Sequence, residues 1–330
     1  MEKEEKLLEV KNLRTSFFTA SGEVKAVNGV SYYVNKHEVV AIVGESGCGK
    51  SVTQMSVMQL VQTPPGRILG GEVIFNGENL LKYGSNSKKI RELRGSSISM
   101  IFQEPMTSLN PVFTIGAQLT EVIRTHKKVS KKEAWKLGVK ALEAVGIPDP
   151  ERRMNNHPFE MSGGMRQRVM IAIAVACESQ LIIADEPTTA LDVTTQAQVM
   201  ELLLSLVEKM NTSLIVVTHN LGLVTRYADR IYVMYAGKVV ESGTTEEILT
   251  DPKHPYTKGL LKSVPKLDKV KGTDLVPIVG TPPNLANLPS YCVFVPRCSE
   301  CREDCKKKNA PELRRVGDSE RMCACHLVEE

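Results

Sequence analysis

The sequence predicts an α/β fold with a mostly parallel central sheet that is covered by helices. Segments typical of strands alternate with segments of helical periodicity, which is the order that builds such a sheet. Several strand segments are short and wholly apolar, as expected for strands buried on both faces. One of them, residues 39–43, runs into a glycine-rich turn and then a helical segment from Lys50. A strand, a glycine-rich turn and a helix in this order are typical of α/β proteins.

The predicted elements cover most of the first 250 residues. The strand candidates are rich in apolar and β-branched side chains and are bounded by turn-forming residues. They span residues 7–19, 23–34, 39–43, 71–75, 181–184 and 213–218, and a hairpin is predicted over residues 230–242. Helical periodicity dominates residues 104–160 and returns over residues 196–210. The stretch 104–160 therefore predicts a helical subdomain inserted into the α/β domain.

The pattern changes near residue 250, which predicts two domains. Residues 1–250 carry the alternating strands and helices. Residues 251–330 are rich in proline and hold six of the eight cysteines. Because this second stretch lacks clear periodicity, it predicts a small cysteine-rich module that is appended to the first domain and does not continue its sheet.

The composition excludes several classes of protein. The 42 Lys and Arg residues against 38 Asp and Glu residues give a net charge of +4, which is too small to indicate a nucleic-acid partner. The longest apolar run, residues 169–177, is far shorter than the ~18 residues that cross a bilayer. The first residues are charged and lack the apolar core of a secretion signal, so we expect a cytosolic protein with reduced cysteines.

Residues 44–51 match the pattern G-x-x-x-x-G-K-[ST] between a buried strand and a helix. Glycines let the backbone wrap around a phosphate, so that several N–H groups and the helix N-terminus face the anion. Lys50 is expected to reach the β- and γ-phosphates, and the Ser51 hydroxyl to bind Mg²⁺. The alternative is an ordinary glycine-rich turn, which the flanking strand and helix disfavour. The residues expected to bind the nucleotide here are Gly44, Glu45, Ser46, Gly47, Cys48, Gly49, Lys50, Ser51 and Val52.

A pair of carboxylates follows the apolar strand at residues 181–184. Asp185, at the tip of the strand, is expected to bind Mg²⁺ directly or through water, and Glu186 to polarise an attacking water. Taken alone, such a pair is more often the start of a solvated loop, but a phosphate loop upstream favours the catalytic interpretation. His219 follows the next predicted strand, and it is a candidate sensor of the γ-phosphate or else a capping residue.

The order of these motifs resembles that of the ATP-binding cassette (ABC) ATPases. The motifs are the phosphate loop, Gln103, Ser162-Gly163-Gly164, Asp185-Glu186, Ala190-Leu191-Asp192 and His219. The resemblance covers about residues 7–250. It implies a P-loop NTPase cassette with a parallel sheet core, an N-terminal antiparallel β subdomain and a helical insertion. It also implies that two cassettes bind two ATP molecules head to tail.

The resemblance assigns a catalytic set and a Mg²⁺ site. Gln103 would link Mg²⁺ and the attacking water to the helical subdomain, which meets the membrane subunit in this family. The catalytic set is Glu186, His219, Gln103 and Lys50. The Mg²⁺ ligands are Ser51, Gln103 and Asp185.

The resemblance also adds residues to the ATP site. The Ser162-Gly163-Gly164 segment resembles the signature motif, whose serine and backbone N–H groups bind the γ-phosphate of ATP held by the other subunit. A glycine pair that opens a helix suits an anion, because the first N–H groups of a helix are unpaired. Asp192 would connect the two sites across the interface. An aromatic residue near the N-terminus stacks on adenine in this family, and Phe17 is the first candidate and Phe18 the second.

Two local features resemble the dipeptide/oligopeptide importer branch of this family. Met165 stands where the signature commonly has glutamine, with His157-Pro158-Phe159 shortly before it. The sequence His254-Pro255-Tyr256-Thr257-Lys258 resembles the start of the C-terminal extension of that branch. The resemblance implies membrane permease subunits, a second ATPase subunit that is either a copy or a different chain, and indirectly an extracellular substrate-binding protein. It implies a peripheral protein at the cytoplasmic face of the cell membrane, without a nucleic-acid partner.

The leading prediction is an ATPase that energises peptide import. Dipeptides, oligopeptides and nickel complexes remain open as cargo, with dipeptides slightly favoured. A soluble ABC protein acting on DNA or ribosomes is an alternative from another class, but such proteins usually carry two cassettes or a long coiled-coil insertion. A regulatory metal-binding protein without turnover is disfavoured by the presence of Glu186, Gln103 and His219.

Six cysteines in the C-terminal stretch predict a metal site more than disulfides, because a cytosolic chain keeps its thiols reduced. They are Cys292, Cys298, Cys301, Cys305, Cys323 and Cys325. Zinc and iron–sulfur clusters both accept four cysteines. The resemblance favours a [4Fe-4S] cluster over the alternatives of Zn²⁺ and of thiols without a metal, and a structural role more than electron transfer. The ligands implied are Cys292, Cys298, Cys305 and Cys325, the last followed by His326.

Overall fold

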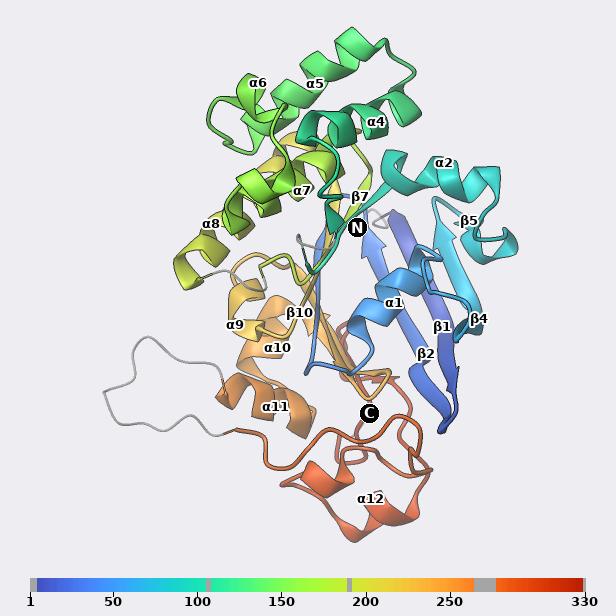
Figure 1. Ribbon diagram of the computed structural model, residues 1–330. Helices are drawn as coiled ribbons and strands as arrows, with labels where there is room; N and C mark the ends of the chain where they lie inside the picture. Colours follow the sequence, from blue (N-terminus) through green and yellow to red (C-terminus); the bar gives the residue numbers. More distant parts are fainter. Residues whose placement is uncertain (1–4, 105–107, 189–191, 264–276, 329–330) are drawn as a thin grey trace. The chain divides into compact units, whose positions relative to one another are not determined.

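The computed structural model describes residues 5–104, 108–188, 192–263 and 277–328 (Figure 1). The chain forms two compact units. The first unit combines Met1–Lys82 with Thr218–Glu330, and the second is the continuous stretch Tyr83–Val217. The first unit therefore joins the N-terminal strands and the phosphate loop to the C-terminal cysteine-rich stretch.

An antiparallel sheet of four strands forms the N-terminal part of the first unit, as predicted. The strands lie in the order β2-β1-β4-β5. Their bounds are β1 Lys6–Thr19, β2 Gly22–Asn35, β4 Gly66–Phe75 and β5 Glu78–Asn79. Strand β4 begins at Gly66 and not near residue 71 as predicted, because pairing with the long β1 extends it in spite of its glycines (Phe17 opposite Gly66).

The second sheet of the first unit includes two short strands from the C-terminal stretch, which the sequence analysis did not expect. Its strands lie in the order β11-β12-β10-β9-β3. Their bounds are β3 Val39–Val43, β9 Arg230–Tyr235, β10 Lys238–Thr244, β11 Arg314–Arg315 and β12 Met322–Cys323. Strand β3 is parallel to β9, and β9 and β10 form the predicted hairpin. The C-terminal stretch was expected not to continue this sheet, but Cys323 lies opposite Glu241, so β12 covers the edge that β10 would otherwise expose.

Helices of the first unit cover and connect these sheets. Helix α1 follows β3 and packs against β1 and β2. Helix α11 begins after the cap residue His254, and its Tyr256 is fully buried. The bounds are α1 Lys50–Val57, η1 Leu80–Lys82, α9 Leu221–Val224, α10 Thr245–Thr250, α11 Pro255–Lys262, η3 Val295–Arg297 and α12 Glu303–Lys307.

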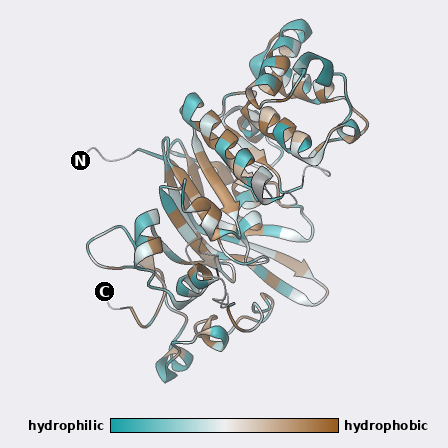
Figure 2. Ribbon diagram, turned by 90° about the vertical axis from the view of Figure 1, so that its left-hand side faces the viewer, coloured by the Kyte–Doolittle hydropathy of each residue, from teal (hydrophilic) through white to brown (hydrophobic). Residues whose placement is uncertain are grey.

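The second unit combines three parallel strands with the helical insertion. The strands β6 Ile98–Ile101, β7 Leu181–Asp185 and β8 Ser213–Thr218 lie in the order β8-β7-β6. Strands β7 and β8 are buried along their whole length, as their apolar sequences predicted, and Figure 2 shows hydrophobic residues concentrated in strands. The helices are α2 Lys88–Ser96, α4 Ile115–Lys127, α5 Lys131–Ala144, α6 Pro150–Arg153, η2 Pro158–Glu160, α7 Gly163–Val175 and α8 Val193–Met210.

Within the described ranges, no helix has both the length and the apolarity that are needed to cross a membrane.

Candidate nucleotide-binding site

The phosphate loop lies between β3 and α1, where the sequence placed it. Gly49 adopts a φ of 101°, and a Cβ there would lie 2.1 Å from the carbonyl oxygen of Ala26. A side chain at this position is therefore excluded both by backbone conformation and by space. Ser46 and Gly47 at the tip of the loop are exposed. The loop is thus packed at its base and open at its tip, which is the form that a phosphate requires.

Lys50 is the first residue of α1, and its side chain folds back onto the loop. The residue is 4% exposed. Its Nζ donates hydrogen bonds to the carbonyl oxygens of Gly44 (2.8 Å) and Glu45 (3.0 Å). The first turn of α1 carries no acidic side chain, so the positive end of the helix and the Lys50 ammonium both favour an anion.

Cys48 fills space under the loop. Burial raises the pKa of its thiol, and the residue is 6% exposed. A buried, protonated thiol is a poor nucleophile. The structure therefore supports a packing role for Cys48 within the loop.

Glu45, the second residue of the loop, has partners that the sequence analysis missed. Its carboxylate accepts two hydrogen bonds from Arg297, and its backbone N–H donates to the Tyr256 hydroxyl. Because Arg297 lies 252 residues away along the chain, no local pattern could have indicated the pair. The C-terminal stretch thus contacts the phosphate loop directly.

The predicted catalytic residues of the second unit meet at the end of β7. Gln103 Nε2 donates a hydrogen bond of 3.0 Å to Glu186 Oε2. Glu186 follows the last residue of β7, Asp185, and both are buried. Glu186 has a φ of 45°, and its backbone N–H donates to the carbonyl oxygen of Val217, which fixes the turn. The structure thus brings Gln103 and Glu186 into contact, and their catalytic roles stay a prediction.

The signature segment caps α7. The Ser162 hydroxyl accepts a hydrogen bond from the backbone N–H of Met165. A Cβ on Gly163 would meet no atom within 4 Å, so packing within the described residues does not require a glycine here. Asp192 similarly caps α8 and accepts two hydrogen bonds from Thr195. Ala190 and Leu191, named with Asp192 in the sequence analysis, lie outside the described residues.

Three further predicted residues belong to the first unit. His219 is exposed directly after β8. Phe17 is half-buried, and its ring contacts Gly66. Phe18 is 48% exposed and its ring lies 5.8 Å from the Arg67 guanidinium. The greater exposure of Phe18 leaves its ring more accessible to a base than that of Phe17, and the choice between them stays a prediction.

The C-terminal cysteines are all free thiols, and the four predicted ligands lie near one another. Burial raises the pKa values of Cys292 and Cys325, and raises that of Cys298 to about 11. Cys305 and Cys325 lie close enough to Cys292 to raise its pKa by electrostatic repulsion. Cys292 and Cys325 raise the pKa of Cys298 in the same way. The free state of the thiols and this shared apolar neighbourhood suit a thiophilic group.

A preformed metal centre is nevertheless not seen. Within the described ranges, no three or more His, Cys, Asp and Glu side chains are grouped so that they could hold a metal ion. The Nε2 atom of His326, next to Cys325, is buried without a hydrogen-bond partner among the described residues. The chemistry of the donors therefore fits a cluster, while the structure shows no assembled ligand set.

The fold and the loop together define an ATP-binding cassette. The family described as "ABC transporter" matches residues 27–189, and "Oligopeptide/dipeptide transporter, C-terminal region" matches residues 240–305. Among solved structures, the dimeric post-hydrolysis structure of the ATP-binding cassette MJ0796, bound to ADP and Pi, superposes with a TM-score of 0.64 at 26% identity. It covers 72% of this chain and 98% of its own. Cassette cbiO1 from Clostridium perfringens superposes with a TM-score of 0.62 at 26% identity, over 75% of this chain and 92% of that one.

Sequence relatives define the branch. The oligopeptide transport ATP-binding protein OppD of Bacillus subtilis (strain 168) is 53% identical over 294 residues, which are 89% of this chain and 82% of OppD. The dipeptide transport ATP-binding protein DppD of the same organism is 52% identical, over 89% of this chain and 87% of DppD. The chain belongs to the ABC transporter family, in the group of peptide transport ATP-binding subunits. Its activity is therefore ATP hydrolysis coupled to peptide import.

Proposed function

We propose that this chain, bound at the cytoplasmic face of the cell membrane, drives the import of dipeptides or oligopeptides through permease subunits. The match to the peptide-transporter C-terminal region carries this proposal, because it separates the chain from cassettes in general. Relatives named for oligopeptides and for dipeptides are almost equally similar, so both cargo classes fit. Import of a nickel complex is the alternative.

The site residues divide the chemistry among them. Lys50 and the N–H groups of residues 44–52 bind the phosphates. Glu186 accepts the proton of the attacking water, and the Gln103 amide orients the Glu186 carboxylate through the 3.0 Å hydrogen bond. His219 contacts the γ-phosphate. Ser51, Gln103 and Asp185 would hold Mg²⁺, which neutralises charge on the phosphates when bound.

A second ATPase subunit, either a copy of this chain or a companion, completes the site. Ser162 and Gly163 are exposed, and the open space around Gly163 can admit a phosphate of the ATP bound by the other subunit. Asp192 lies at the same interface in this proposal. The head-to-tail arrangement explains why Gly163 is not needed for packing within the described residues of one chain.

Exposed apolar side chains of the second unit are proposed to bind the permease. Phe102, Phe113 and Phe159 are 41%, 54% and 69% exposed. Phe102 directly precedes Gln103, and Phe159 lies three positions before Ser162 of the signature segment. Phe113 lies within the helical insertion. Exposed aromatic residues are frequent anchors of protein interfaces. In this scheme residues 1–250 form the cassette, with 104–160 as its helical subdomain, and residues 251–330 form the extension.

The cysteine-rich extension is proposed to hold a [4Fe-4S] cluster on Cys292, Cys298, Cys305 and Cys325 as a structural clasp, with Zn²⁺ as the alternative. The test is the iron and zinc content of anaerobically purified protein, together with its visible absorbance. Cys325→Ala is expected to lose the metal, whereas Cys323→Ala, which alters a residue within β12, is expected to keep it. Protein without stoichiometric iron contradicts the cluster, and stoichiometric zinc establishes the alternative.

Hydrolysis is tested with Glu186→Gln, measured as Mg²⁺-dependent ATPase activity of the assembled transporter. The variant is expected to bind ATP but to lose at least ~100-fold in turnover, because the base is removed. Glu178→Gln is the matched control, since Glu178 belongs to the same unit and pairs with Lys127 at the surface. If Glu186→Gln leaves turnover unchanged, Glu186 is not the general base. Uptake of labelled dipeptides, longer peptides and nickel chelates by the same transporter identifies the cargo.

A further inference from the structure

We propose that Arg297, in the C-terminal extension, is a positioning residue for the phosphate loop: it holds the Glu45 carboxylate and so sets the affinity for ATP. The inference rests on ATP binding by residues 44–51 and is independent of the cargo. It assigns the extension a part in the nucleotide site of its own chain.

The contact between Arg297 and Glu45 has the geometry of a strong ion pair. Arg297 Nη1 donates to Glu45 Oε2 at 2.6 Å, and Nη2 donates to Oε1 at 2.8 Å. The Arg297 side chain is 4% exposed and that of Glu45 27%. Two parallel, charge-assisted hydrogen bonds in a mostly buried setting are stronger and more directional than a surface ion pair.

Contacts other than the one with Glu45 also hold the Arg297 side chain in place. Its Nε donates to the carbonyl oxygen of Val279 at 3.2 Å, and its guanidinium lies 5.8 Å from the centroid of the Tyr235 ring. Its backbone N–H donates to the carbonyl oxygen of Phe294, the residue that caps η3. A guanidinium fixed in this way loses little freedom when it binds a carboxylate, so it can position Glu45.

A second contact from the same region holds the backbone of Glu45. The Tyr256 hydroxyl oxygen accepts a hydrogen bond of 2.9 Å from the Glu45 N–H. Tyr256 is fully buried and packs between Tyr235 and Phe294, with ring centroids 4.6 and 5.4 Å away. Both the side chain and the backbone of Glu45 are therefore held by residues of the stretch 256–297. Glu45 acts here as the anchor of the loop.

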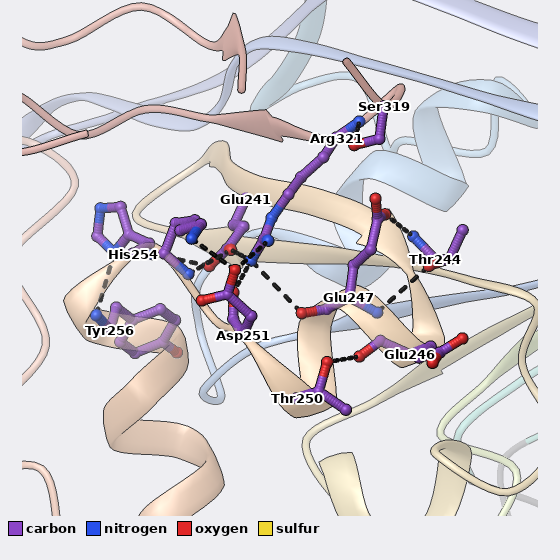
Figure 3. Close-up of polar contacts among 11 residues, drawn as sticks. Glu241, Thr244, Glu246, Glu247, Thr250, Asp251, His254, Tyr256, Ser319 and Arg321 are labelled. Carbon is purple, nitrogen blue, oxygen red and sulfur yellow. Dashed lines mark hydrogen bonds and ion pairs between the residues drawn. The ribbon is translucent and has the colours of Figure 1, made fainter. Parts of the chain in front are cut away.

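Figure 3 shows how Tyr256 is fixed in turn. The buried carboxylate of Glu241 accepts hydrogen bonds from the backbone N–H groups of Lys253 and His254, and from Arg321. His254 Nδ1 then accepts the backbone N–H of Tyr256 at 3.1 Å, which caps helix α11. Arg297 directly precedes Cys298, and Arg321 lies two residues before Cys323. Glu45 is therefore held directly by Arg297, at one end of the cysteine-rich stretch. It is held indirectly by Arg321, near the other end, through Glu241 and the helix that carries Tyr256.

The anchor connects directly to Lys50. The Lys50 ammonium donates a hydrogen bond of 3.0 Å to the carbonyl oxygen of Glu45. If Glu45 shifts, an acceptor that holds the ammonium over the loop shifts with it. Loss of Arg297 should therefore weaken phosphate binding, while Glu186 and Gln103, which are proposed to activate the water, lie on other elements.

The experiment is a double-mutant cycle on the full chain with Arg297→Gln and Glu45→Gln. Equilibrium affinity for ATP is measured with Mg²⁺, and KM and kcat are measured in the assembled transporter. Each single variant is expected to raise the dissociation constant and KM for ATP ~10-fold, with kcat within about twofold of the parent. The double variant is expected to be no weaker than either single variant, because the pair acts as one contact.

Two further variants separate positioning from folding. Tyr256→Phe removes only the hydroxyl that accepts the Glu45 N–H, so it should keep the aromatic packing and raise KM about threefold. Arg302→Gln, an exposed arginine of the same stretch, should leave KM unchanged. Affinities within twofold of the parent for folded Arg297→Gln and Tyr256→Phe overturn the proposal. Additive effects of Arg297→Gln and Glu45→Gln overturn it as well. If Arg297→Gln fails to fold, Tyr256→Phe and Arg297→Lys decide in its place, since a positioning role requires a raised KM in both.

Discussion

At the scale of single residues, the buried ion pair of Glu241 and Arg321 stabilises the first unit. Glu241 is fully buried, and Arg321 is 5% exposed. Besides Glu241 in β10, Arg321 contacts Asp251 and donates to the carbonyl oxygen of Glu247 in α10 (Figure 3). One guanidinium, directly before β12, therefore joins β10 to α10. A buried carboxylate that loses its partner keeps the cost of its desolvation.

We therefore predict that Arg321→Ala lowers the free energy of unfolding by about 3 kcal/mol. Lys258→Ala, which removes an exposed pair with Glu300, should cost less than ~1 kcal/mol. Urea unfolding followed by circular dichroism gives both values. Equal losses in the two variants would show that Arg321 contributes no more than a surface charge.

His254 makes the stability of this region depend on pH. Burial lowers the pKa of His254 from 6.5 to about 4, so the folded state keeps the imidazole neutral where the unfolded chain begins to bind a proton. Stability is therefore complete above pH 6.5 and falls as the pH decreases from 6.5 to 4, by roughly 3 kcal/mol. Protonation would also remove the Nδ1 acceptor that caps α11.

The pH effect is measured as the difference in unfolding free energy between the parent and His254→Asn from pH 7.5 to pH 4.5. Asparagine can accept the same backbone N–H but does not titrate, so the variant should lose the slope that His254 contributes. Parallel pH profiles of parent and variant would contradict this assignment.

At the scale of elements, the pairing of β1 with β4 depends on one glycine. Gly71 has a φ of 103°, and a Cβ there would lie 2.6 Å from the Leu13 Cα in β1. We predict that Gly71→Ala destabilises the protein by ~2–4 kcal/mol, whereas Gly70→Ala costs under ~1 kcal/mol, because a Cβ on Gly70 meets nothing within 4 Å. Thermal unfolding of the two variants is the measurement. A milder effect at Gly71 than at Gly70 would refute the claim that the pairing of β1 with β4 requires a glycine at position 71.

The elements also show what the sequence could predict. Apolar runs such as residues 181–184 and 213–218 are buried strands because only burial on both faces suits such residues, and the phosphate loop follows from its glycine and lysine spacing. Residues 66–70 of β4 were not predicted as strand, because pairing with β1 and not their own sequence stabilises them in this conformation. Strand β12 is two residues long, and its formation depends on the edge of β10, far away in sequence. The Arg297–Glu45 pair escaped prediction for the same reason.

At the scale of the whole molecule, the proposed ATP site is completed by a second ATPase subunit. We predict that Gly163→Asp blocks ATP hydrolysis by the assembled transporter while the variant still binds ATP in its own phosphate loop. An acidic residue in the first turn of α7 suits the helix dipole, so the fold should survive, but its charge would repel the phosphate held by the neighbouring subunit. ATPase activity and nucleotide binding are measured together. Activity close to that of the parent would exclude the signature segment from the partner's site.

The division of the chain into an interrupted unit and a continuous one has a consequence for biosynthesis. The stretch 83–217 leaves the ribosome as one piece and contains its own three strands and helices. The first unit, which is formed from residues 1–82 and 218–330, can complete its sheet only at the end of translation. The residues that pair with the edge of β10 are translated long after β10 itself. During that interval the nascent chain presents an unprotected strand, which makes late translation the stage at which chaperones and misassembly compete for this protein.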